Sequence, residues 1–546
     1  MATANTLLTP FARPSTSPAI VLPASSHLPN TTLSYRQLAS HIDSLRQQLE
    51  AWSGGLKAGD VVSMSLINGP EFAIAFLGVG SHRAEDRITS YYRTSLIADS
   101  QPPFSRCVAA PLNPTYNPSE VAFYLEDTQS RLLLVPSGAI KANHSAVQAA
   151  SKLNVPIAEI SFDGKNLSLH FEKKDSTGGG KKIEGSGQPR EDDVALVLHT
   201  SGTTGRPKAV PLTHLNLATT MQNIVNTYKL TARDRTYLVM PLFHVHGLLA
   251  GFLAPLLSAG SVVIPPKFSA GTFWAEFINA KANWYTAVPT IHQILLSTKL
   301  PNPIPDIRFI RSCSSALAPA TLEKVEKAFN APVLEAYAMT EAAHQMTSNP
   351  LPPMARKPGT VGIGQGVSIR ILSLSEDKDV EEGEVAIKGL NVTLGYINNE
   401  KANKESFTKD GYFRTGDRGK LDPEGYLTLT GRLKELINRG GEKISPLEVD
   451  AALLSLQNVN EAVAFGVPDQ KYGEKVWACV VIKARSDLKE KNIIEQVRKK
   501  ISNFKCPEKV FVLDSIPKGP TGKINRRNLA TKFAQQEKEN EGKAKL

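Results

Sequence analysis

The chain has 546 residues, of which 41% are hydrophobic and 21% charged, and its formal net charge is +11. A chain of this length is expected to divide its core between two or more domains. Its best candidate for a membrane span, Leu248 to Ile264, is interrupted by two serines and a glycine. That excludes a span of about eighteen apolar residues and indicates a core segment instead.

The charge excess comes from 63 Lys and Arg against 52 Asp and Glu. Such an excess suits either nucleic acid or an enzyme with anionic small-molecule ligands. No recognisable nucleic-acid motif accompanies it, so a solvated surface is the favoured interpretation. The four cysteines (Cys107, Cys313, Cys479 and Cys506) form no CxxC motif. This favours a reduced compartment and argues against a structural zinc site.

The N-terminal part alternates between helical and strand-like patterns. Tyr35 to Trp52 has helical spacing, Val61 to Ile67 has the pattern of a buried strand, and Glu71 to Gly78 is helical again. This alternation predicts layered α/β structure.

Two stretches interrupt the pattern. Residues 81–106 have no clear period, and the apolar run before them resumes at Cys107. An unstructured stretch of this length is uncommon inside a domain, so it is either a lineage-specific insertion or mistranslated intron. Residues 172–190 contain the run DSTGGGKKIEGSG and are interpreted as a flexible linker.

A strand-like run, Asp193 to Thr200, leads directly into the sequence TSGTTGRPK at Thr200 to Lys208. Its hydroxyls and glycines let the backbone turn tightly and direct donors at phosphate oxygens, while Arg206 and Lys208 add positive charge. The Walker A motif is excluded because Gly-Lys-Ser/Thr is absent. A surface turn is the alternative, but the pattern favours a phosphate-binding loop made of Thr200, Ser201, Gly202, Thr203, Thr204, Gly205 and Lys208.

The C-terminal part has its own pattern of elements. We expect a helix near Pro446 to Leu456, strands at Ala462 to Gly466 and Val476 to Ile482, a helix at Glu490 to Phe504 and a strand at Val510 to Leu513. The chain is therefore divided into a large N-terminal domain of layered α/β subdomains (1–430), a small α+β domain (431–535) and a flexible polar tail (536–546).

The last three residues, Ala544-Lys545-Leu546, are similar to the Ser-Lys-Leu peroxisomal address. A chance match is the alternative. The tail predicts recognition by the peroxisomal import receptor and delivery to the peroxisome matrix, with the cytoplasm as a second location.

Thr200 to Lys208 is similar to the phosphate loop of the adenylate-forming superfamily, which includes acyl-CoA synthetases, luciferases and peptide-synthetase adenylation domains. Further motifs occur in the family's order: PLFHVHG at 241–247, EAYAMTE at 335–341, YFRTGD at 412–417, GRLKEL at 431–436 and PTGKI at 520–524. The resemblance covers the chain from about Ser34 to Lys532, apart from residues 81–106.

This resemblance implies an enzyme that activates a carboxylic acid with ATP as its acyl-adenylate and transfers the acyl group to coenzyme A. Because a carboxylate must attack a phosphate, the site has to neutralise charge and hold the reactants in line. The resemblance assigns the α-phosphate to Thr340 and Mg²⁺ to Glu341. It assigns the nucleoside to Ser315, Ala316, Glu335, Ala336, Tyr337, Asp417 and Arg432.

The resemblance also implies that the small domain is mobile. Lys523 matches the lysine that bridges the acyl carboxylate and the α-phosphate during adenylation, so it is the first candidate for a catalytic residue. Lys434 matches the hinge about which the small domain rotates between the two half-reactions. Coenzyme A is assigned to Gly440, Gly441, Lys443 and, more weakly, Lys505.

Within the superfamily, residues 335–349, 357–362 and 436–449 most resemble oxalate–CoA ligases of plants and fungi. His244, Ser314 and His344 are expected near the acyl group, where a fatty or aromatic acid would need small apolar residues. Imidazoles and a hydroxyl suit the second carboxylate of a short dianion. His244 is also a general active-site residue of the family. Oxalate is therefore the expected acid. The alternatives are another short or medium-chain acid, a coumarate-like acid or, in another class, an RNA-binding or scaffold protein.

Overall fold

The computed structural model describes residues 6–7, 9–11, 15–24, 28–52, 55–80, 107–172, 189–200, 207–483, 488–518 and 524–544. The predicted insertion at 81–106 and most of the predicted linker at 172–190 lie outside these ranges.

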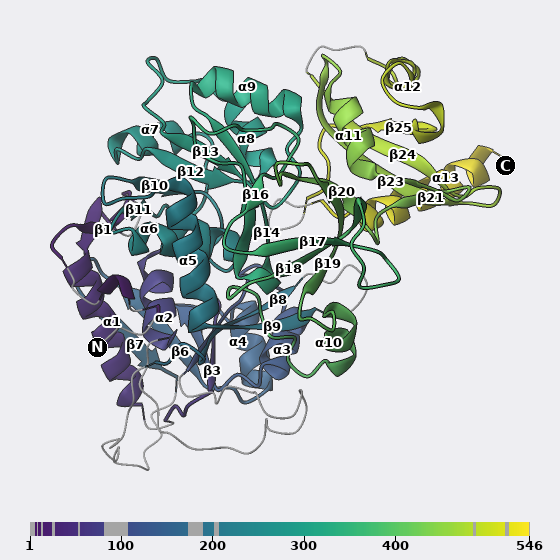
Figure 1. Ribbon diagram of the computed structural model, residues 1–546. Coiled ribbons are helices and arrows are strands. Elements are labelled where there is room, and N and C mark those ends of the chain that lie inside the picture. The colour runs from purple at the N-terminus through teal and green to yellow at the C-terminus, as the bar shows by residue number, and fades with distance from the viewer. Residues whose placement is uncertain are drawn as a thin grey trace.

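Two large sheets with helices packed against them make up most of the molecule (Figure 1). The first sheet has seven strands in the order β7-β6-β5-β3-β4-β8-β9 and is parallel except at its edge pairs, β6–β7 and β8–β9. Its strands are β3 (Val61–Met64), β4 (Val108–Pro111), β5 (Leu132–Pro136), β6 (Ile157–Phe162), β7 (Leu167–Phe171), β8 (Val194–Thr200) and β9 (Lys208–Thr213). Its helices are α2 (Pro70–Gly80), α3 (Pro118–Asp127) and α4 (Ser145–Lys152).

The second sheet has nine strands in the order β16-β15-β14-β13-β12-β10-β11-β1-β2. Its interior pairs are parallel, and antiparallel pairs close both edges. The strands are β1 (Pro18–Leu22), β2 (Thr31–Ser34), β10 (Arg235–Leu238), β11 (Ser261–Val263), β12 (Trp284–Ala287), β13 (Phe309–Ser312), β14 (Val333–Met339), β15 (His344–Ser348) and β16 (Ile363–Gly364). The helices with this sheet are η1 (Thr9–Phe11), α1 (Tyr35–Glu50), α5 (His214–Tyr228), the π-helix η3 (His246–Leu253), α6 (Ala254–Leu257), α7 (Phe273–Asn279), α8 (Pro289–Leu296), α9 (Pro319–Phe329) and η4 (Thr340–Ala342).

A four-stranded antiparallel sheet follows, made of β17 (Ser368–Leu372), β18 (Glu382–Lys388), β19 (Phe413–Leu421) and β20 (Leu427–Arg432), with α10 (Glu400–Ser406) beside it. These sheets and helices confirm the predicted layered α/β fold.

Helix α1 shows how local sequence fixes the elements. Ser34 accepts a hydrogen bond from the backbone of Gln37, whose side chain accepts from the backbone of Ser34, so two backbone donors at the helix start are satisfied. The buried side chains recur every three or four residues, from Tyr35 to Leu49. The predicted helix is confirmed and ends at Glu50, whereas the predicted strand at Val61 to Ile67 already ends at Met64.

The apolar run from Leu248 to Ile264 lies in the core, as predicted, as the end of η3, α6 and β11. The backbone of Gly247, just before this run, is packed closely against the backbone of Pro241. A Cβ atom on Gly247 would lie 2.2 Å from the carbonyl oxygen of Pro241, so only glycine fits at this position.

The C-terminal unit is a sheet of β22 (Glu442–Ile444), β21 (Ile437–Arg439), β24 (Gly473–Ile482) and β23 (Val459–Asp469), with β25 (Lys509–Val512) on β24. Its helices are α11 (Pro446–Leu454), α12 (Glu490–Arg498), η5 (Asn503–Lys505) and α13 (Arg526–Ala544). Every element predicted here is present, but α12 is shorter than expected because the chain turns after Arg498. Figure 1 shows this unit at one end of the molecule, with α11 beside α9 and β20.

The prediction of a flexible tail from residue 536 is wrong, because α13 continues to Ala544. The segment is rich in Gln, Glu, Lys and Ala, which are strong helix formers. Gln535 donates to Glu539 one turn later at 3.3 Å, and Lys509 pairs with Glu537, which joins the helix to β25.

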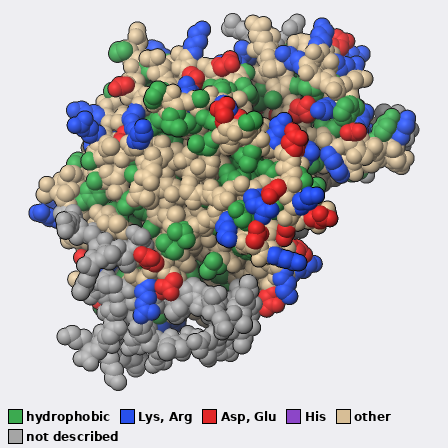
Figure 2. All heavy atoms as spheres, in the orientation of Figure 1, with side chains coloured by type: hydrophobic (Ala, Val, Ile, Leu, Met, Phe, Trp, Pro, Cys, Tyr) green, Lys and Arg blue, Asp and Glu red, His purple; other side chains and the backbone are tan. Residues whose placement is uncertain are grey.

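Charged side chains of both signs are interspersed on the face shown in Figure 2. On this face the net positive charge therefore does not gather into one basic patch.

Candidate active site

Three of the residues assigned to the nucleoside lie together. Tyr337 on β14 donates its hydroxyl to Asp417 Oδ2, and Arg432 Nε lies 3.2 Å from Asp417 Oδ1. Asp417 and Arg432 are partners in the β19–β20 register. Burial raises the pKa of Asp417, while the charge of Arg432 and the hydrogen bond from Tyr337 oppose that shift. The result is a carboxylate held between a phenol and a guanidinium, an acceptor suited to hydroxyl groups.

Glu335 lies two residues before Tyr337 on β14 and is 5% exposed. Its Oε1 accepts from the backbone of Leu317 at 3.0 Å, while Oε2 has no hydrogen-bond partner among the described residues. Burial raises the pKa of Glu335 to about 8. Ala336 follows it on β14, and Ser315 and Ala316 are exposed in the loop before α9.

Glu341 is a buried carboxylate in the turn η4, which begins with Thr340. Its Oε1 accepts from the hydroxyl of Tyr396 at 2.8 Å. Burial raises the pKa of Glu341, and the Tyr396 hydrogen bond and the charges of Lys208 and Arg432 oppose this shift. Among the described residues, no group of three or more His, Cys, Asp or Glu side chains is placed to hold a metal ion.

Lys208 contacts Tyr396, the residue that bonds Glu341. Its Nζ lies 4.4 Å from the centroid of the Tyr396 ring. Burial and the nearby positive charge of Lys434 lower the pKa of Lys208. Lys208 pairs with Thr200 across β8 and β9, which fixes the two ends of the predicted phosphate loop. The rest of that loop (Ser201, Gly202, Thr203, Thr204 and Gly205) lies outside the described residues, as does Lys523.

Ser314 and His344, assigned to the acid, are brought close together through a third residue. Ser314 Oγ lies 3.0 Å from His246 Nδ1, and the rings of His246 and His344 stack with centroids 5.2 Å apart. His246 and His344 are buried. Ser314 and His344 both have positive φ (72° and 107°), an uncommon conformation for side-chain-bearing residues that concentrates at functional sites.

His244 was predicted to lie near the acid, but His246 makes the hydrogen bond to Ser314. His244 is half-buried in the turn before η3, and its ring lies 5.9 Å from that of Phe243. The motif PLFHVHG contains both histidines, so the second was available as a candidate.

Arg311 is the residue that sequence reasoning missed entirely. It lies on the interior strand β13 and is completely buried. Its guanidinium donates to Tyr228 Oη at 2.8 Å, Thr286 Oγ1 at 3.2 Å and Gln345 Oε1 at 3.3 Å. No Asp or Glu among the described residues pairs with it. A permanent positive charge is thus buried beside His246 without a carboxylate partner in the described part of the chain.

The residues assigned to the hinge and coenzyme A lie mostly at the start of the C-terminal unit, in and just before the β21–β22 hairpin. Lys434, Gly440, Gly441 and Lys443 are exposed. Gly440 and Gly441 have positive φ (63° and 94°) in the β21–β22 turn, and the Gly440 backbone donates to Tyr472 O at 2.7 Å. Lys505 pairs with Glu448 at 2.7 Å.

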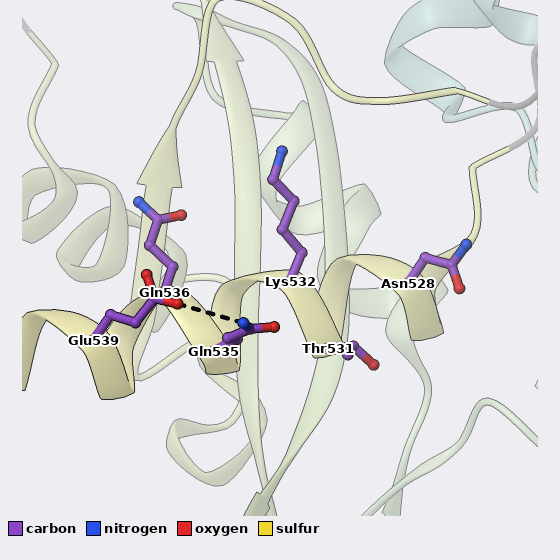
Figure 3. A pocket seen from close by; sticks show the side chains of 6 residues that line it. All are labelled: Asn528, Thr531, Lys532, Gln535, Gln536 and Glu539. Atoms are coloured by element: carbon purple, nitrogen blue, oxygen red, sulfur yellow. Dashed lines mark hydrogen bonds between the residues drawn. The ribbon is translucent and has the colours of Figure 1, made fainter.

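A hollow with a different lining lies on one face of α13 (Figure 3). Six polar side chains of this helix line it: Asn528, Thr531, Lys532, Gln535, Gln536 and Glu539. In the part of the chain that the structure describes, no helix is long and apolar enough to cross a membrane.

Comparison with known proteins identifies the family. The chain belongs to the AMP-binding enzymes: the family model matches residues 104–397, and the model of the family's C-terminal domain matches residues 448–523. This confirms the resemblance inferred from the motifs.

Two relatives and one solved structure illustrate the similarity. The chain is 46% identical to oxalate–CoA ligase of Saccharomyces cerevisiae, over 97% of this chain and 96% of the relative. It is 47% identical to oxalate–CoA ligase of Arabidopsis thaliana, over 88% and 89% of the two chains. The structure of ATP-bound MatB from Rhodopseudomonas palustris superposes with a TM-score of 0.82 at 27% identity and covers 97% of this chain and 99% of that one.

Proposed function

We propose that this protein is an ATP-dependent acid–CoA ligase that converts oxalate to oxalyl-CoA. The carboxylate of the acid attacks the α-phosphate of ATP and releases pyrophosphate, and the thiol of coenzyme A then displaces AMP. Membership of the AMP-binding enzymes and the two oxalate–CoA ligase relatives support this reaction.

The nucleotide would lie along the edge formed by β14, η4 and β19. Asp417 would accept from the ribose hydroxyls, with Arg432 beside it, and Tyr337, Glu335, Ala336, Ser315 and Ala316 would surround the base. The hydroxyl of Thr340 would donate to the α-phosphate. Thr200 to Lys208 would hold the outer phosphates, where the cation of Lys208 offsets their negative charge.

Glu341 fits a role in holding Mg²⁺. It offers a buried carboxylate oxygen, and Mg²⁺ in nucleotide sites commonly takes one or two carboxylates together with substrate phosphates. When bound, the ion would supply positive charge to the phosphates. The hydrogen bond from Tyr396 orients the carboxylate for this role.

The buried polar cluster around Ser314 is the observation that carries the choice of acid. A fatty or coumarate-like acyl group would require an apolar lining, but Ser314 bonds His246, which in turn stacks on His344 and contacts the buried cation of Arg311. Oxalate keeps one carboxylate charged after the other is activated. That second carboxylate would accept hydrogen bonds from the cluster and balance its positive charge. His244 would lie beside it as a general active-site residue.

The two half-reactions would be divided between two placements of the C-terminal unit, with Lys434 at the hinge. Lys523 would bridge the acyl carboxylate and the α-phosphate in the first. In the second, Gly440 and Gly441 would border the pantetheine arm, where the lack of side chains allows close approach, and Lys443 would meet the phosphates of coenzyme A.

We place the protein in the peroxisome matrix, delivered by the import receptor through Ala544-Lys545-Leu546, with the cytoplasm as the other location. The tripeptide's similarity to Ser-Lys-Leu supports this. A fluorescent fusion that retains this C-terminus should co-localise with a peroxisomal marker, and removal of the tripeptide should leave it diffuse.

The reaction is tested by measuring coenzyme-A-dependent AMP release with oxalate, malonate, acetate, octanoate and coumarate. We expect the highest kcat/KM with oxalate. Oxalate turned over no better than octanoate or coumarate would contradict the proposed acid. An RNA-binding or scaffold protein would instead bind RNA in a salt-sensitive way that Lys523→Ala leaves unchanged.

A further inference from the structure

A chain of hydrogen bonds leads from the buried guanidinium of Arg311 to Ser314. Thr286 and Arg311 are neighbours in the register of β12 and β13, and Arg311 Nη1 donates to Thr286 Oγ1 at 3.2 Å. Thr286 Oγ1 lies 2.6 Å from His246 Nε2. His246 Nδ1 in turn lies 3.0 Å from Ser314 Oγ.

The direction of this chain follows from the donors available. A guanidinium has only donors, so Thr286 Oγ1 accepts from Arg311 and keeps its own proton to donate, with His246 Nε2 as the nearest acceptor. Arg311 Nη1 also faces that nitrogen, at 3.5 Å. A proton on Nε2 would point at these donors, and a charged imidazolium would be repelled by the guanidinium. The two donors that face Nε2, Thr286 and Arg311, therefore favour the tautomer with the proton on Nδ1.

This tautomer determines what Ser314 presents. With the proton on Nδ1, His246 donates to Ser314 Oγ, and the hydroxyl proton of Ser314 is left to donate to another acceptor. In the other tautomer Ser314 would donate to His246 and turn its oxygen lone pairs toward the acyl site, where they would repel a carboxylate.

We propose that Arg311 is a specificity-determining positioning residue, which acts through Thr286 and His246 to hold Ser314 as a hydrogen-bond donor to the substrate's second carboxylate. The inference rests on the proposed function, because it needs an acid with a second carboxylate. Arg311 does not itself touch the acid.

The link through Thr286 gives the sharpest test. Thr286→Val keeps the shape of the side chain and removes the hydroxyl, and with it the 2.6 Å contact to His246 Nε2. We expect the KM for oxalate to rise by about 10-fold to 100-fold, the effect of losing one hydrogen bond to a charged group, with the KM for ATP unchanged. Thr286→Ser retains the hydroxyl and should restore the wild-type KM.

Thr236 provides a matched control. It is fully buried on the neighbouring strand β10, and its hydroxyl has no hydrogen-bond partner among the described residues. Thr236→Val should therefore leave both KM values unchanged. A wild-type KM for oxalate in folded Thr286→Val would overturn the inference.

A second pair of variants tests Arg311 directly. Arg311→Lys keeps a side chain that can only donate, whereas Arg311→Met removes the donors. We expect Arg311→Met to lose most of the preference for oxalate over acetate and Arg311→Lys to recover part of it.

Arg308→Gln is the structural control. Arg308 directly precedes β13 and pairs with Asp234 at 2.8 Å, so its loss should affect the melting temperature but not the preference for oxalate over acetate. Equal preferences in Arg311→Met and wild type would also overturn the inference.

These results separate the two proposals. If wild type prefers malonate and Thr286→Val raises the KM for malonate, oxalate is the wrong acid but the role of Arg311 stands. If wild type prefers oxalate and Thr286→Val is unaffected, the function stands and the role of Arg311 fails. A wild-type preference for octanoate contradicts both.

Discussion

Arg526 Nη2 lies 2.6 Å from Asp450 Oδ2, so the first residue of α13 is held by a carboxylate on α11. The same guanidinium reaches Glu435, next to the hinge candidate Lys434, at 3.3 Å, and donates to Ala464 O at 2.8 Å. Arg526 follows Lys523 by three positions. The ion pair therefore ties one end of the proposed catalytic loop to the hinge segment.

Removing the charge of Asp450 should destabilise the C-terminal unit. We expect Asp450→Asn to cost about 3 kcal/mol in the free energy of unfolding, because the largely buried guanidinium loses the nearer of its two carboxylate partners. Urea unfolding of the full chain measures this. Glu448→Gln, on the same helix but in an exposed pair with Lys505, should cost less than about 1 kcal/mol. An equal loss of unfolding free energy in the two variants would show that the Arg526–Asp450 pair stabilises the unit no more than an exposed pair does.

The buried Glu335 predicts a pH-dependent stability. Its pKa is raised from 4.5 to about 8 in the folded protein, so the folded state holds the proton more tightly than the unfolded state. The resulting stability is full below the unfolded pKa and is lost as pH rises through about 8. Glu335→Gln keeps an acceptor for Leu317 and does not titrate. The melting temperature of Glu335→Gln minus that of wild type should therefore increase from about pH 5 to about pH 8, and a constant difference would contradict the raised pKa.

The contact of Tyr396 with Glu341 predicts a nucleotide defect. Tyr396→Phe removes the hydrogen bond to the carboxylate but keeps the ring against Lys208, so kcat/KM for magnesium-ATP should fall about tenfold. Tyr412→Phe is the control, because its hydroxyl bonds the exposed Ser368 at 2.8 Å. Steady-state kinetics at varied Mg²⁺ makes the comparison, and similar values for the two variants would argue against the role of Glu341.

The glycines of the β21–β22 turn predict a selective loss of the second half-reaction. Gly441 and Gly425 have φ of 94° and 83°, and a Cβ atom on either would meet nothing within 4 Å. Alanine at either position should cost about 1 kcal/mol through backbone strain. Only Gly441→Ala should slow thioester formation from preformed adenylate, by about 100-fold if the approach of the pantetheine arm is displaced. Equal rates for both variants would remove Gly441 from the coenzyme A site.

Lys523 is predicted to act in the first half-reaction alone. Lys523→Ala should abolish acid-dependent exchange of pyrophosphate into ATP and preserve thioester formation from preformed adenylate. Lys518→Ala, which breaks a surface pair with Glu461 at 2.7 Å, should retain both. Loss of both half-reactions alike in Lys523→Ala would rule out the assigned role.

Features encoded over short distances in the sequence were predictable. The helical spacing from Tyr35 to Trp52 located α1, and the matched motifs assigned Tyr337, Asp417 and Arg432 to the same ligand. Ser314 and His344 were likewise placed near each other.

Features that depend on strand order were not predictable. An arginine in the run Phe309–Ser312 looks like the end of a strand until β13 is known to lie between β12 and β14, in the interior of the sheet, where Arg311 is fully buried. The bond between Thr286 and His246 needs the same information. Helix α13 was missed beyond residue 535 for another reason, because a helix that is polar on nearly all sides lacks the apolar period used to detect one.

The π-helical turn at His246–Leu253 has a consequence for evolution and engineering. Its wider winding accommodates an extra residue relative to an α-helix, and such turns are often retained where they position a side chain. Deleting one residue from it would allow ordinary winding and a more regular core, but would rotate the residues before the deletion by about 100° relative to those after it. Family members that differ by one residue here would therefore present a different side chain to the acid without any change in the motif itself.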